Sequence, residues 1–171
     1  MGADSIAICK LFMEFERVPG KRQVGTGWLI DEKTVVTAAH CAYQRDVRHA
    51  VSITVHVGYR GRQNEDTLVS TGGKHVAINL GYYVFEQQGE DKRRRPYDVA
   101  FIRLAEPFHG VKPVPWADCP LQADDIRVRV VGYPTDLDGG DHMYESECQT
   151  TIDLQQSKFM LEYGLDTFKG T

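Results

Sequence analysis

A histidine and an aspartate that lie far apart in this sequence could carry acid–base chemistry together. His40 follows a β-branched run at residues 34–37, and Asp98 precedes a mostly apolar run at residues 99–104. A histidine with a pKa of about 6.5 can accept and return a proton at neutral pH. A buried carboxylate can fix the tautomer of the imidazole and stabilise its cation. Together they are two of the three groups that activate a serine hydroxyl, although each taken singly also has a structural reading.

The elements that must position these two residues are predicted to be short β-strands. Residues 51–57 and residues 126–131 alternate apolar and polar side chains, which is the period of a strand with one buried face. Glycine and proline interrupt such runs, a pattern typical of an all-β sandwich or barrel. Only residues 38–47 are helix-like. The predicted strands are residues 5–15, 24–30, 34–37, 51–57, 75–78, 99–104, 126–131, 147–152 and 158–162.

The composition excludes several classes of protein. The chain has 171 residues, of which 42% are hydrophobic and 26% are charged, as in an ordinary globular protein. A net charge of −4 argues against a nucleic-acid partner. The sequence contains no apolar run of about 18 residues, so no membrane span is predicted. No signal peptide precedes the four cysteines. We therefore expect an intracellular protein, with the cytoplasm favoured; secretion after removal of a leader is the alternative.

One charged segment stands apart from the predicted strands. Residues 86–96 are polar and include the basic run Lys92-Arg93-Arg94-Arg95. The favoured interpretation is an exposed, solvated loop. A recognition or processing site for another protease is an alternative, and a nucleic-acid patch is the least favoured because Glu90 and Asp91 adjoin the run.

The two motifs resemble those of the trypsin-like serine peptidases. Residues 37–41, Thr-Ala-Ala-His-Cys, resemble the histidine motif of that family, and residues 98–104, Asp-Val-Ala-Phe-Ile-Arg-Leu, resemble its aspartate motif. Residues 25–30 resemble the strand that precedes the histidine. Residues 130–134, Val-Val-Gly-Tyr-Pro, resemble a signature of the V8-like, glutamyl endopeptidase branch, and residues 163–171 resemble the segment that leads to its nucleophile.

This resemblance implies an all-β fold of two antiparallel β-barrels, the second of them incomplete. The first barrel would span residues 6–106 and carry His40 and Asp98, and the second would span residues 112–171. By resemblance, His40 is the general base and then the general acid, and Asp98 orients it and stabilises its cation. The family's activity is endopeptidase cleavage of a peptide or protein substrate. No cofactor and no metal are implied.

The remaining site residues are implied by the last segment of the chain. Gly170 matches the glycine whose backbone N–H contributes to the oxyanion hole. Thr167 matches a pocket threonine of glutamyl endopeptidases, which favours glutamate. Asp166 stands where trypsin carries its pocket aspartate, which favours arginine or lysine. Both specificities stay open at this point.

The sequence departs from the family pattern at the nucleophile. The pattern is Gly-x-Ser-Gly, and the chain stops at Gly170-Thr171, one residue before the expected serine. We therefore expect a fragment that is inactive alone, with the remainder of the second barrel supplied by C-terminal sequence. The alternative is a catalytically inactive, peptidase-like binding or regulatory domain of a larger intracellular protein.

The cysteines form a second departure. In the digestive branch, the cysteine after the histidine is bridged to the strand that precedes it, but the matching position here is Gly25. Cys41 is therefore expected to be a buried free thiol, and Cys9 a core residue. Cys119 and Cys148 are left either free or paired with each other.

Overall fold

The computed structural model describes residues 7–61, 70–118 and 122–153, and the larger of its two sheets forms a closed antiparallel β-barrel. The strands follow the order β1-β2-β3-β7-β6-β5, and pairing of β1 with β5 closes the barrel. A two-residue strand, β4 (Tyr43–Gln44), pairs in antiparallel register with the beginning of β5. The barrel strands are β1 (Ile8–Phe15), β2 (Arg22–Asp31), β3 (Thr34–Thr37), β5 (Arg48–Val57), β6 (Ser70–Ile78) and β7 (Ala100–Leu104).

The barrel interior is filled by side chains that alternate along its strands. In β1, Cys9, Leu11, Met13 and Phe15 all point inward and are at most 2% exposed. They pack against apolar side chains of the other strands, which include Leu29, Val35, Val55, Ile102 and Leu104. Burial of this many apolar side chains is the main favourable term that holds the barrel closed.

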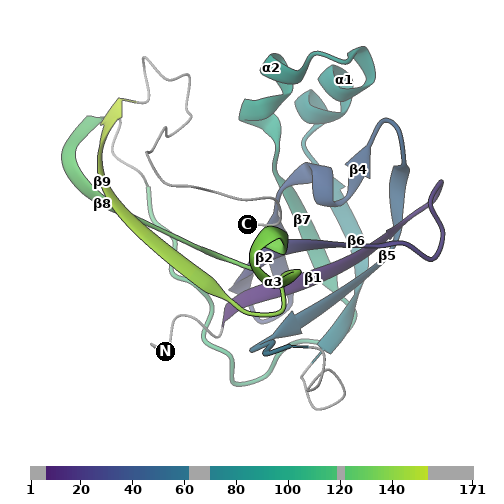
Figure 1. The fold of residues 1–171 in the computed structure, drawn as a ribbon, viewed down its shortest axis with the longest axis horizontal. Coiled ribbons are helices and arrows are strands. Elements are labelled where there is room, and N and C mark those ends of the chain that lie inside the picture. Colours follow the sequence, from purple (N-terminus) through teal and green to yellow (C-terminus); the bar gives the residue numbers. More distant parts are fainter. Residues whose placement is uncertain (1–6, 62–69, 119–121, 154–171) are drawn as a thin grey trace.

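A second sheet lies beside the barrel and consists of two described strands. Strand β8 (Gln122–Gly132) pairs in antiparallel register with β9 (Tyr144–Asp153), and the short helix α3 (Thr135–Asp138) lies between them. Figure 1 shows this curved pair to one side of the barrel, with α3 in front of β2. The prediction of an all-β fold of two antiparallel β-barrels, the second of them incomplete, is confirmed in that a closed barrel lies beside a second, partial sheet. The domain boundaries at residues 106 and 112 stay a prediction.

Hydrogen bonds and an ion pair join the barrel to the segment that connects β8 to β9. The amide of Tyr133 donates to Thr26 Oγ1 on β2 at 3.0 Å. Lys10 of β1, which is 1% exposed, donates to the carbonyl of Gly140 and lies 3.6 Å from a carboxylate oxygen of Asp141. Its ammonium group also lies 3.9 Å from the centre of the Tyr59 ring. A buried ammonium needs such partners to offset its lost hydration, so this lysine ties β1 to the turn before β9.

The helices differ from the sequence prediction. Residues 38–47, expected to be helix-like, form only a short 3₁₀ turn, η2 (Ala39–Cys41), followed by β4. Two helices instead lie between β6 and β7. They are α1 (Leu80–Gln88) and α2 (Asp91–Arg94), which precede the 3₁₀ turn η4 (Arg95–Tyr97). The segment expected to be an exposed loop is therefore largely helical. Among the described residues, no helix has the length and apolar composition needed to cross a membrane.

Local capping explains α1. The side chain of Asn79 accepts a hydrogen bond from the amide of Gly81 at 2.8 Å, which satisfies a donor at the helix N-terminus. Gly89 ends the helix with a φ of 72°, in the left-handed conformation that glycine adopts without strain. These caps offset the aromatic residues of the helix, whose types favour strands.

The packing of β2 against β3 can be tested where the two strands approach each other closely. A Cβ atom on Gly27 would lie 2.6 Å from Val35 Cγ1 and 2.9 Å from the carbonyl oxygen of Val36. We expect Gly27→Ala to lower the free energy of unfolding by about 1–3 kcal/mol, because backbone atoms must move. The measurement is urea denaturation of the full-length gene product.

The matched control is Gly72→Ala on β6, where a Cβ would meet nothing within 4 Å. This change should leave stability unchanged or raise it by about 0.4–1 kcal/mol. Equal losses in the two variants would contradict the proposed packing between β2 and β3.

Candidate active site

His40 is presented at the end of the buried strand β3. The strand runs directly into η2, in which Ala39 and Cys41 are buried while the His40 side chain between them is 52% exposed. The carbonyl of His40 accepts a hydrogen bond from Gln44 Nε2 at 2.9 Å. The turn therefore directs the imidazole outward, with buried neighbours holding its backbone in place.

Asp98 reaches the same place through strand pairing. It follows η4 and precedes β7, and the register of β3 with β7 sets Thr37 opposite Ala100. His40 lies three residues after Thr37, and Asp98 lies two residues before Ala100. An antiparallel pair brings these two positions to the same end of the barrel, so two residues that are distant in sequence become neighbours.

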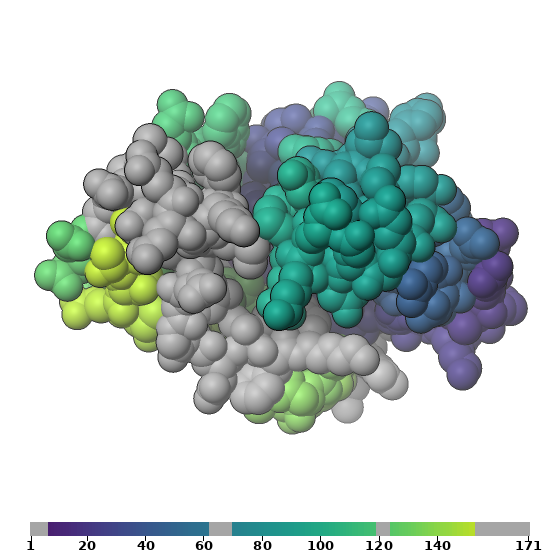
Figure 2. Space-filling model, turned by 90° about the horizontal axis from the view of Figure 1, so that it is seen from above, coloured from purple at the N-terminus to yellow at the C-terminus, as the bar shows by residue number. Residues whose placement is uncertain are grey.

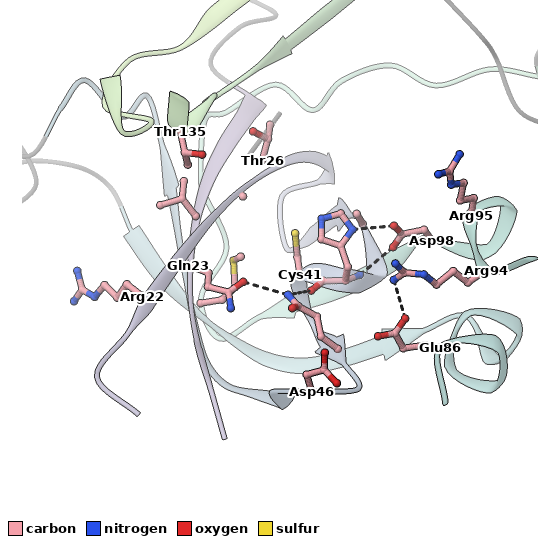
Figure 3. Close-up of a pocket in the computed structure, with 16 residues that line it drawn as sticks. Arg22, Gln23, Thr26, Cys41, Asp46, Glu86, Arg94, Arg95, Asp98 and Thr135 are labelled. Atoms are coloured by element: carbon pink, nitrogen blue, oxygen red, sulfur yellow. Dashed lines mark hydrogen bonds and ion pairs between the residues drawn. The ribbon is translucent and has the colours of Figure 1, made fainter. Parts of the chain in front are cut away.

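The Asp98 carboxylate contacts His40 at two points. Its Oδ2 lies 2.8 Å from His40 Nδ1, and its Oδ1 accepts a hydrogen bond from the His40 backbone amide at 2.9 Å. Figure 3 shows both interactions. A carboxylate at Nδ1 favours a proton on that nitrogen. Nε2, on the other side of the ring, is then the nitrogen that is available to a further group.

The contact shifts the titration of both residues. The hydrogen bond with Asp98, and next the contact with Cys41, raises the pKa of His40 to about 10, although burial acts in the opposite direction. Burial alone would raise the pKa of Asp98, but the hydrogen bonds and the charge of His40 together hold it below its ordinary value. The pair therefore favours an imidazolium beside a carboxylate, which is the state reached when His40 accepts a proton.

These residues open into a cavity of about 840 Å³. Its wall includes Thr26 of β2, Cys41 of η2 and Thr135 of α3, so it lies between the barrel and the turn after β8. Figure 2, seen from above, shows the residues of α1 and α2 in teal near the middle of this face and residues of β9 in yellow-green toward its left side. The exposed side of His40 therefore faces an open cavity rather than packed protein.

Comparison with known proteins decides the family. The trypsin family model matches residues 11–160. The chain belongs to the trypsin family. A glutamyl endopeptidase of Bacillus licheniformis is 28% identical over 147 residues, which cover 85% of this chain and 42% of the relative. The chain thus spans less than half the length of this curated relative.

Solved structures show the same fold. A Glu endopeptidase in complex with MPD superposes with a TM-score of 0.67 at 18% identity, over 97% of this chain and 70% of that chain. Protease Anisep from Arthrobacter nicotinovorans gives a TM-score of 0.63 at 17% identity, over 92% and 70%. The resemblance to trypsin-like serine peptidases is confirmed, and its V8-like branch is consistent with these findings.

The structure brings only part of the predicted trypsin-like site into view. His40 and Asp98 lie together, as described above. Asp166, Thr167 and Gly170 lie outside the described residues, and their roles stay predictions. Within the described part of the chain, no group of three or more histidine, cysteine, aspartate or glutamate side chains could hold a metal ion.

The cysteine expectations can be compared with the structure directly. Cys9 and Cys41 are buried free thiols, and Cys148 is also free, whereas Cys119 lies outside the described residues. A Cβ atom on Gly25 would lie 2.9 Å from Cys41 Sγ. Gly25 therefore occupies the position from which the digestive branch forms its bridge, and its lack of a side chain leaves Cys41 unbridged.

The sequence analysis missed a second group of residues on the cavity wall. Arg94 lies 2.7 Å from Glu86 in an ion pair and 3.3 Å from the hydroxyl of Tyr82, and Glu86 also accepts from the amide of Arg45 at 2.8 Å. Both Glu86 and Arg94 line the cavity. The spacing of Asn79 and Gly89, which is typical of the two ends of a helix, could have placed Glu86 on a helix, but it says nothing about Arg94.

The His40–Asp98 contact leads to a prediction about titration. We expect Asp98→Asn to lower the pKa of His40 from its raised value toward the ordinary value of about 6.5, because the amide removes the charge and weakens the hydrogen bond that favour the imidazolium. The measurement is an NMR titration of the His40 ring in the full-length gene product.

The control is Asp46→Asn, a change to another carboxylate on the cavity wall. Asp46 is paired with Arg45 at 3.6 Å rather than with His40. It should leave the His40 titration in place. A His40 pKa that is equal in Asp98→Asn and in the unmodified protein would contradict the assignment of the shift to Asp98.

Proposed function

We propose that the protein containing this chain is a serine endopeptidase in which His40 and Asp98 belong to the catalytic triad. The observation that carries the proposal is the two-point contact of Asp98 with His40 at the mouth of a cavity, in a chain of the trypsin family. The nucleophile would be a serine beyond Thr171, at the next position of the Gly-x-Ser-Gly pattern. The 171-residue chain by itself would then be inactive.

The reaction proceeds by two transfers of an acyl group. The serine oxygen attacks the carbonyl carbon of the peptide, and its proton passes to Nε2 of His40. The C–N bond then breaks, and His40 returns the proton to the leaving amine. Water repeats these steps on the acyl-serine, which yields the carboxylic acid and the free serine.

Asp98 acts through His40 in each of these steps. It keeps the proton of the neutral ring on Nδ1, so that Nε2 can accept one from the serine. It also stabilises the imidazolium that forms when Nε2 accepts the serine proton. The backbone N–H of Gly170 would stabilise the negative oxygen of the tetrahedral intermediate.

Cleavage after glutamate is the primary specificity that the relatives favour. The Bacillus licheniformis relative is named a glutamyl endopeptidase, and the hydroxyl of Thr167 could donate to a glutamate carboxylate. Asp166 would favour arginine or lysine instead. Peptides that differ only in the residue before the cleaved bond, with glutamate, arginine or lysine at that position, distinguish the two specificities.

A fluorophosphonate probe tests the proposal, because it labels serines that an adjacent base activates. The full-length gene product should be labelled on one serine beyond Thr171, and the 171-residue chain should not be labelled. His40→Ala should reduce labelling by about 10⁴-fold or more, since the serine then has no general base.

The matched control is His109→Ala. The side chain of His109 is 80% exposed, and the nearest carboxylate is Glu32 at 3.7 Å, so its loss should leave labelling unchanged. Absence of labelling on folded full-length protein would overturn the proposal and favour a peptidase-like binding or regulatory domain.

A further inference from the structure

In the structure, the basic side chains of residues 92–95 have different surroundings. Arg93 lies 2.8 Å from Glu90 in an ion pair and stacks on Phe85, with its guanidinium 4.2 Å from the ring centre. Arg94 lies 2.7 Å from Glu86 and 3.2 Å from Asp91. Both are engaged in holding α1 and α2 together. Neither is free to bind a further anion without losing these partners.

Arg95 differs from its neighbours. Its side chain is exposed and lines the same cavity as His40 and Asp98. Within the described part of the chain, no carboxylate lies within ion-pair distance of its guanidinium. Figure 3 shows that Arg94 reaches Glu86, whereas Arg95 extends away from Glu86 on the other side of Asp98.

The backbone of Arg95 is held in a fixed relation to Asp98. Its carbonyl accepts a hydrogen bond from the Asp98 amide at 3.2 Å, across the turn η4. Pro96 follows directly, and its ring restricts the backbone torsions of this turn. The backbone of Arg95 is thus held next to Asp98, while its exposed side chain keeps the freedom to meet a ligand.

The cavity wall offers Arg95 no compensating charge of its own. The described carboxylates that line it each have another partner: Asp98 is hydrogen-bonded to His40, and Glu86 and Asp46 form ion pairs with Arg94 and Arg45. Arg22, a further cation on the wall, lies 3.7 Å from Glu14. Arg95 therefore contributes a positive charge that an anionic ligand can match. A carboxylate suits the planar guanidinium because it can accept two parallel hydrogen bonds.

We propose that Arg95 is a specificity-determining residue that binds an acidic side chain of the peptide substrate at a position flanking the cleaved bond. The proposal rests on the peptidase function above. It concerns a different subsite from the primary pocket, because Asp166 and Thr167 are proposed to line that pocket, whereas Arg95 belongs to the first barrel. A lysine or arginine at the same substrate position is repelled.

The test uses peptides that are identical except at one position, where glutamate, glutamine or lysine is placed. Each position on both sides of the cleaved bond is varied in turn, and kcat/KM is measured with the full-length gene product. At one flanking position, glutamate should be preferred over glutamine by roughly threefold to tenfold, the effect of one partly exposed ion pair. This preference should fall as salt is added.

Three variants assign the preference to its residue. Arg95→Gln should bring the ratio of glutamate to glutamine to about 1, and Arg95→Glu should invert the preference toward lysine. Lys92→Gln is the matched control, since it removes one positive charge from the same segment at an exposed side chain outside the cavity wall. It should leave both activity and the ratio unchanged.

Several outcomes would overturn the proposal. They are an unchanged ratio in Arg95→Gln, an equal loss of preference in Lys92→Gln, and an effect confined to the residue at the cleaved bond. If the unmodified protein hydrolyses none of the peptides, the peptidase function fails by itself. Binding of the same fluorescent peptides, measured by anisotropy, then decides about Arg95: tighter binding of the glutamate peptide that Arg95→Gln abolishes supports it, and equal binding overturns it.

Discussion

The carboxylate of Asp98 is the group on which the candidate site depends. One oxygen faces the ring of His40 and the other accepts from the backbone amide of the same residue. Hydrogen bonds to an ionised acceptor are roughly twice as strong as neutral ones. Because both bonds end on one residue, the carboxylate fixes the turn η2 and the orientation of the imidazole together. Loss of either hydrogen bond would leave the group held by the other one, the imidazole ring or the turn η2, freer to move.

This contact exists only because the barrel sets the register of two strands. Thr37 of β3 lies opposite Ala100 of β7, and the short segments beyond them carry His40 and Asp98 to one end of the sheet. A slip of one residue in this pairing would move every side chain of a strand to the opposite face. The inward-facing side chains Val35 and Ile102, which are fully buried, prevent that slip. The core therefore specifies the geometry of a site that lies at the surface.

The parts of this molecule that local sequence could predict are those with local causes. Period-2 alternation predicted β5 and β8, and the residue types around His40 and Asp98 identified the two motifs before their contact was known. Helix α1 was missed because its aromatic residues favour strands, while the caps at Asn79 and Gly89 carry the opposing signal. The pairing of Glu86 with Arg94 could not be predicted either. It depends on how α1 and α2 pack, and no periodic pattern in the sequence records that packing.

The same distinction between local and long-range causes explains how charge is arranged around the cavity. Arg94 and Arg95 are adjacent in sequence and identical in type, so residue type alone cannot assign them different roles. The end of α2 turns Arg94 toward Glu86, and the turn η4 directs Arg95 to the other side of Asp98. The first arginine stabilises the wall, and the second leaves a positive charge on it. The loop that holds Asp98 in place thereby also carries a positive charge at the cavity. Under the proposed function, positioning of His40 and selectivity for the substrate would share this one short segment of the chain.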